Sequence, residues 1–147
     1  MDRKEYIPGA CNIGAAEIAR RKRWGWLGLV DTIVLWAVFA LLDADALWRL
    51  TFFFPATFSA MGFLQAHMHF CAVFGFASLL NFGDVGHAIP VVQAEHRGQD
   101  RRKAWQITAY AVVVGLVVAY IGYRMSLPGH SLGRSWLLTF HEKIAAW

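Results

Sequence analysis

Two cysteines and a histidine are the residues of this sequence best suited to chemistry. His67 and Cys71 are four residues apart, so in a helix their side chains share one face. Zinc and copper accept thiolate and imidazole ligands. Cys11, His67 and Cys71 therefore form a candidate metal set for Zn or Cu. The loop that follows offers two candidates for the fourth ligand, His87 and His96. Alternatively, both cysteines are small buried residues without chemistry.

A second candidate site is a polar pair inside the apolar part of the sequence. Asp31 lies about 10 Å along a helix from Trp24, and His67 about 6 Å from Cys71. If the two helices run antiparallel, Asp31 and His67 lie at similar depths in the membrane. The sequence therefore predicts that Asp31 and His67 form a buried pair. The alternative is that Asp31 bonds to a neighbouring helix or stays hydrated near the membrane surface.

Other chemistry has weaker support. His67 or His69 could ligate haem or chlorophyll, but no neighbouring residue specifies a pigment. The sequence has no phosphate-binding loop, no paired catalytic carboxylates and no catalytic triad spacing. No catalytic residue is predicted, and the protein is expected not to be an enzyme.

Three apolar stretches must position these groups: residues 24–42, 50–71 and 105–123. Each approaches the ~20 residues that a helix needs to cross a bilayer. The chain is 57% hydrophobic and only 16% charged, against about a quarter charged in soluble domains. These features predict one all-α membrane domain over residues 1–147, with three transmembrane helices.

Local signals refine these elements. Asn12 is a predicted helix cap, and the first helix is expected to start near Ala15. The apolar residues after Cys71 are interpreted as an extension of the second helix or an interfacial segment. Residues 83–104 are expected to form a polar connection, and Pro128-Gly129 to end the third helix.

The charges between the spans predict an orientation. Basic residues precede the first span, the next link is acidic, and the link at residues 97–103 is basic again. Because cytoplasmic segments retain Lys and Arg, this pattern puts the N-terminus in the cytoplasm and the C-terminus outside. It also accounts for the net charge of +4 without a nucleic-acid partner. Tryptophans at the span ends are expected to anchor at the headgroups: Trp24, Trp26, Trp48 and Trp105.

The last segment, residues 131–147, has an apolar stripe at steps of four residues. The stripe consists of Leu132, Trp136, Phe140 and Ile144. This spacing predicts an amphipathic helix that lies on the outer membrane surface and docks on lipid or on a partner protein.

Several motifs resemble a known family. Cys11-Asn12-Ile13-Gly14, Glu17-Ile18, Arg20-Arg21 and His69-Phe70-Cys71 are similar to motifs of small, functionally uncharacterised bacterial integral membrane proteins. This resemblance covers residues 10–82. More loosely, the Asn-x-Gly start at Asn12, the arginine pair and the late Cys71 are similar to the membrane domain attached to some bacterial rhodaneses. That domain has a Cys-Pro pair, whereas here Ala72 follows Cys71. The resemblance implies a bacterial inner membrane and implies no reaction. With the orientation expected from the charges, the C-terminus would lie in the periplasm.

Two functions follow from these observations. The favoured one is a non-enzymatic accessory or structural subunit of a larger membrane complex, in respiratory or photosynthetic electron transfer. Its expected partners are the lipid bilayer and other membrane protein subunits. The alternative is a small thiol- or metal-binding membrane protein with its site at the cytoplasmic face.

Overall fold

The structure, a computed structural model, describes residues 6–85 and 87–125. It is mostly helical, which confirms the predicted class. The elements are α1 (Ala15–Leu41), the 3₁₀ helix η1 (Trp48–Phe52), α2 (Phe53–His67), α3 (Ala72–Ala77), β1 (Leu79–Leu80), β2 (Ile89–Pro90) and α4 (Ala94–Arg124). The predicted start of the first helix at Ala15 is confirmed.

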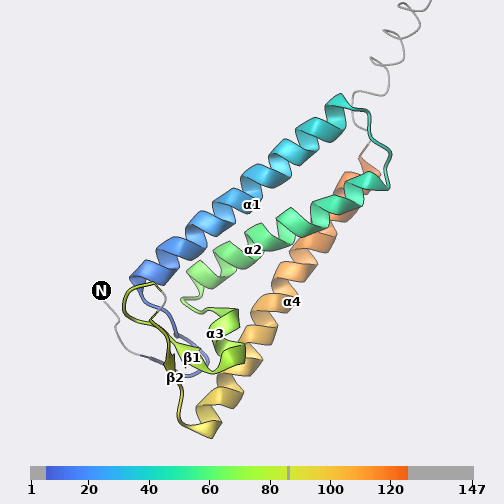
Figure 1. The fold of residues 1–147 in the computed structure, drawn as a ribbon. Coiled ribbons are helices and arrows are strands. Elements are labelled where there is room, and N and C mark those ends of the chain that lie inside the picture. The colour runs from blue at the N-terminus through green and yellow to red at the C-terminus, as the bar shows by residue number, and fades with distance from the viewer. Residues whose placement is uncertain (1–5, 86, 126–147) are drawn as a thin grey trace, which may run out of the picture.

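Three helices run along the length of the molecule, with α2 packed against both α1 and α4 (Figure 1). Glycines lie at the contacts between them. Gly25 of α1 lies against Gly62 of α2, and Gly28 lies against Ser59. Across the other contact, Gly115 of α4 faces Thr57. Both neighbours run antiparallel to α2. Small residues let helix backbones approach closely, which is how helices commonly pack where lipid surrounds them.

One end of the bundle carries a small cap made of α3, the β1–β2 hairpin and the N-terminal segment before α1 (Figure 1). β1 and β2 pair antiparallel, and Ile13 forms a parallel bridge with Asn81. The main apolar cluster lies under the cap and comprises Phe70, Ala72, Ala104 and Ile107. The cap therefore joins the N-terminal segment and residues 72–90 to the base of α4.

The second apolar stretch differs from its predicted bounds of 50–71. Its helix ends at His67, because His69 adopts the left-handed conformation with φ of 52° and turns the chain. The residues after Cys71 form the separate short helix α3 instead of extending α2.

Three other local predictions need correction. Gly14 occupies the N-cap position of α1, whereas Asn12 lies two residues earlier and bonds elsewhere. α4 already begins at Ala94, so half of the segment predicted as a polar connection is helical. α4 ends at Arg124, before Pro128-Gly129. The predicted tail helix at 131–147, with Leu132, Trp136, Phe140 and Ile144, lies outside the described residues.

Two helices, α1 and α4, are long and apolar enough to cross a membrane. Only 11% of the apolar window of α1 and 28% of that of α4 are buried in the molecule. The core helix of a soluble protein would be mostly buried, so this arrangement is compatible with a membrane protein. The second apolar stretch is divided between η1 and α2, and neither of these helices is itself a candidate span.

Candidate functional site around Cys71

Cys71 lies fully buried where the chain turns from α2 into α3. The side chain of Asn12 holds Cys71 in place through two hydrogen bonds to the Cys71 backbone. The Asn12 Nδ2 donates to the Cys71 carbonyl oxygen at 3.1 Å, and the Cys71 N–H donates to Asn12 Oδ1 at 2.7 Å. One amide side chain thus satisfies two buried backbone groups and fixes the position of the thiol.

The sulfur of Cys71 is surrounded by hydrogen-bond donors. Arg21 of α1 donates from Nη2 to Sγ at 2.9 Å, and the backbone of Val73 and Phe74 at the start of α3 acts on the thiol in the same direction, towards a lower pKa. Burial nevertheless raises the pKa of the Cys71 thiol, and these donors only partly oppose that effect. The thiolate is the nucleophile and the metal ligand, so the raised pKa favours an unreactive thiol at neutral pH.

Glu17 completes this cluster from one turn before Arg21. Its side chain is fully buried. It lies 2.9 Å from Nη2 of Arg20 and 3.6 Å from Nη2 of Arg21, and its Oε1 accepts a 3.4 Å bond from Asn81. Arg21 therefore links a buried carboxyl to a buried sulfur. Removing one member of such a buried set would leave the others without compensation.

A second buried carboxyl, Asp100 of α4, holds the N-terminal segment. It accepts a hydrogen bond from the Tyr6 hydroxyl and another from the Gly9 N–H, both at 2.7 Å. Burial raises the pKa of Tyr6 above its usual value, and the hydrogen bond to Asp100 is a second, smaller cause of the same shift. These bonds fasten the N-terminal segment to the base of α4.

The structure does not bring the predicted metal ligands together. Among the described residues, no group of three or more His, Cys, Asp or Glu side chains is placed to hold a metal ion. Cys11 is half-buried and its Sγ donates to the Ile13 carbonyl, while His67 is exposed at the end of α2. His87 is exposed, and His96 packs against the Tyr6 ring at 6.0 Å.

The structure also separates Asp31 from His67. Both side chains are exposed, and the described residues contain no ion pair between them. The Gly25–Gly62 and Gly28–Ser59 contacts fix the register of α1 on α2. This register places the two residues about 16 Å apart along the helices. The depths inferred from the sequence assumed a helix that continued to Cys71.

The sequence interpretation missed Glu17, Arg21, Asn81 and Asp100. A weak signal existed for the first two, because a single acid stands four residues before Arg21 in an otherwise basic run. Nothing local marks Asn81 or Asp100 as buried, since their partners are 64 and 91 to 94 residues away.

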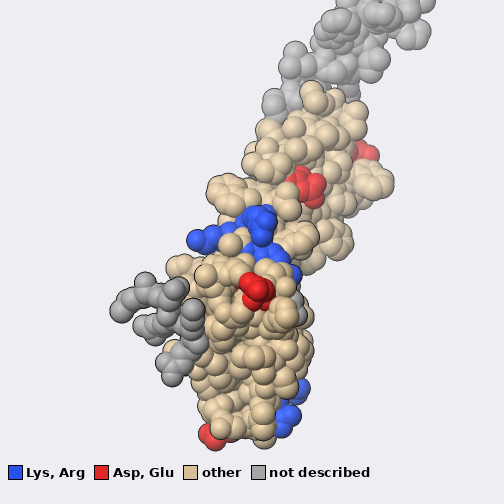
Figure 2. Space-filling model, turned by 60° about the vertical axis from the view of Figure 1, so that its left-hand side comes forward, with Lys and Arg blue, Asp and Glu red and all other residues tan. Residues whose placement is uncertain are grey.

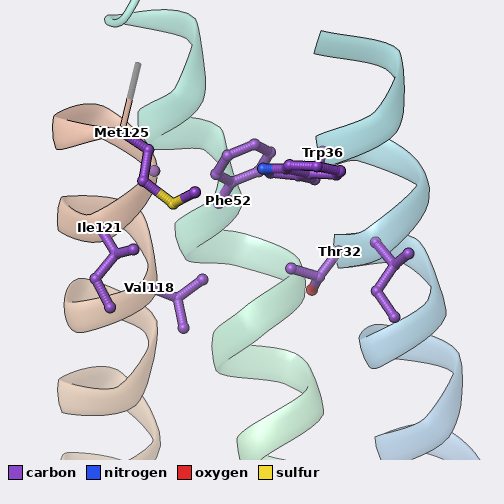
Figure 3. Close-up of a pocket in the computed structure, with 8 residues that line it drawn as sticks. Thr32, Trp36, Phe52, Val118, Ile121 and Met125 are labelled. Atoms are coloured by element: carbon purple, nitrogen blue, oxygen red, sulfur yellow. The ribbon is translucent and has the colours of Figure 1, made fainter. Parts of the chain in front are cut away.

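An apolar pocket of about 200 Å³ lies between α1 and α4, towards the end of the molecule opposite the cap (Figure 3). Trp36 and Phe52 close its upper side, and Thr32 supplies the only hydroxyl. That hydroxyl already donates to the Gly28 carbonyl at 2.7 Å. The remaining lining residues are Ile33, Val118, Ile121, Gly122 and Met125. This lining suits a hydrocarbon and offers no acid, base or nucleophile.

Comparison of the chain with known protein families, curated proteins and solved structures finds no match. The site is therefore interpreted from its own geometry.

Proposed function

We propose that the protein is a non-enzymatic accessory subunit of a larger bacterial membrane complex, held in the inner membrane by three spans. The observation that carries this proposal is the distribution of apolar side chains. Large apolar residues are exposed along α1 and α4, while the contacts between helices use glycine, alanine and serine. Such a surface requires lipid or protein around it.

The three-span arrangement adds η1 and α2 to the two long helices. η1 and α2 together cover residues 48–67, and a helical segment of this length can cross about 30 Å of bilayer. The register of the helices puts the basic run before Trp24 and the basic run before Trp105 near the same end of α2. Figure 2 shows Lys and Arg in a band across the middle of one face and again near its lower end, whereas the charged patches on the described surface above the band are acidic. Positive residues concentrated at one end favour a cytoplasmic cap.

The internal use of polar groups supports a non-enzymatic role. Glu17, Asn12 and Cys71 bond to other groups of the same chain. Their hydrogen bonds and ion pairs hold the cap against the helices. The Cys71 thiol is buried, and its pKa is raised.

Blue-native electrophoresis and native mass spectrometry after mild detergent extraction test this proposal. We expect the full chain in an assembly much larger than 16.5 kDa. Deleting residues 131–147 should leave the chain inserted but release it from that assembly, because the predicted tail stripe would dock on the partner. A full-length chain that runs alone in all mild detergents would refute the proposal.

The orientation has its own test. A periplasm-dependent reporter fused after Trp147 should be active, and the same reporter fused before residue 6 should be inactive. Activity of both fusions, or of only the second, would contradict three spans with a cytoplasmic N-terminus.

A thiol function at the cytoplasmic face is the second candidate, and the Arg21–Cys71 contact favours it. A guanidinium at 2.9 Å would stabilise a thiolate once the proton had left. If this contact serves chemistry, Cys71 should react with iodoacetamide faster than a buried thiol does, and Arg21→Gln should slow that reaction. If the contact is structural, Arg21→Gln should loosen the cap and accelerate the reaction. The direction of the change separates the two roles.

A further inference from the structure

The outward-facing carboxyl of Asp31 carries an inference about the partner. We propose that Asp31 docks onto a transmembrane helix of another protein, one that carries a Lys, Arg or His at the depth of Asp31. The inference rests on the proposed function and specifies the chemistry of the subunit that the chain contacts.

Asp31 lies well inside the apolar length of α1. It comes seven residues after Trp24 and ten before Leu41, so it lies about 10 Å from one end of this stretch and about 15 Å from the other. The side chain is exposed, and the residues one turn before and after it on the same side, Leu27 and Val34, are exposed as well. In the described part of the chain, Asp31 has no hydrogen bond or ion pair.

The exposure of Asp31 gives its side chain no internal role in the described bundle. Ile33, two residues further along α1, lines the pocket shared with α4. Residues two apart on a helix point to different sides, so Asp31 points to the flank of α1 turned away from α4. Ionisable residues within spans nearly always face a bundle interior, a water-filled cavity or a partner charge. An acid on an outer apolar flank therefore indicates that the flank is covered in the complete assembly.

Charge complementarity identifies the occupant. The segments 24–41, 53–66 and 105–123 contain no Lys, Arg or His. His67 lies about 16 Å away along the helix axis. A second copy in the same orientation thus offers no cationic group at this depth, and lipid tails offer none either. A different membrane protein with a basic side chain at that depth matches both the carboxyl and the surrounding apolar surface.

Photocrosslinking in native membranes tests the inference with the full chain. A benzophenone amino acid at position 27 or 34 is activated, and the crosslinked peptide is identified by mass spectrometry. The same membranes are analysed by blue-native electrophoresis for the wild type, Asp31→Asn and Asp31→Leu. Asp45→Asn is the matched control, because Asp45 is an exposed acid beyond the end of α1.

The expected result is a crosslink to a transmembrane helix with Lys, Arg or His at matching depth. Both Asp31 variants should weaken the assembly roughly tenfold, as expected for loss of an intramembrane polar contact, while Asp45→Asn should not. An assembly that persists unchanged in both Asp31 variants would overturn the inference and leave the subunit proposal standing. Crosslinks to lipid alone, or to a second copy, would also overturn it. A wild type that runs alone would overturn both.

Discussion

The contact between Gly62 and α1 gives the sharpest test of how the bundle is packed. A Cβ at position 62 would lie 2.5 Å from the Gly25 nitrogen, 2.7 Å from the Gly25 Cα and 2.9 Å from the Arg21 carbonyl oxygen. All three atoms belong to the backbone of α1, so no side-chain rotation relieves the clash. α1 and α2 must move apart by about 0.9 Å to restore ordinary contact.

The cost of Gly62→Ala follows from that displacement. A gap of 0.5–1 Å forfeits about a quarter to a half of each dispersion contact along an interface. Overpacking of this kind costs about 1–3 kcal/mol, and the better helix propensity of alanine returns about 0.5–1 kcal/mol. We expect a net loss of about 1–2 kcal/mol in the free energy of unfolding.

The assay is unfolding by SDS titration in mixed micelles, followed by tryptophan fluorescence. Gly98→Ala is the matched control, because a Cβ at that helical position meets nothing within 4 Å. It should stabilise the protein by about 0.5–1 kcal/mol. If Gly62→Ala is as stable as the wild type while the control behaves as expected, the close α1–α2 approach is refuted.

Two further predictions concern the cap. Asn12→Ala removes both hydrogen bonds to Cys71 and should lower the free energy of unfolding by about 1–3 kcal/mol for each buried group left unpaired. The alkylation rate of Cys71 should rise in parallel, and unchanged stability and reactivity would show that these bonds contribute nothing. Because the pKa of Tyr6 is raised in the folded protein, its contribution to stability is fully present below pH 10 and is lost as the pH rises further. Ultraviolet difference titration against Tyr6→Phe should show this late ionisation, and Asp100→Asn should bring it closer to pH 10.

The sequence was informative where local composition decides the structure. The long apolar run at residues 24–42 requires a helix whatever its neighbours are, and the start of that helix near Ala15 was predicted correctly. The break after His67 was not predictable, because Met68, His69 and Phe70 contain neither glycine nor proline. Their turn is held instead by a long-range contact, in which the Asn12 N–H donates to the His69 carbonyl.

The candidate site was only half visible for the same reason. Cys71 could be selected by residue type, but its partner Arg21 is 50 residues away and looked like one of several membrane-flanking cations. The burial of Glu17 depends on Asn81, at a separation of 64 residues. Residue types suggest which groups can react, whereas tertiary packing decides which of them meet.

The anchoring of the N-terminal segment has a consequence for biogenesis. This segment is synthesised well before its partners Cys71, Asn81 and Asp100. The cap therefore cannot close until the base of α4 has been made, and contacts this distant in sequence form slowly. Until then, the carboxyl of Glu17 stays in water. Closure of the cap is thus a late step of synthesis, and a chain truncated before α4 would expose the Glu17 carboxyl and the Cys71 thiol to water and to quality-control proteases.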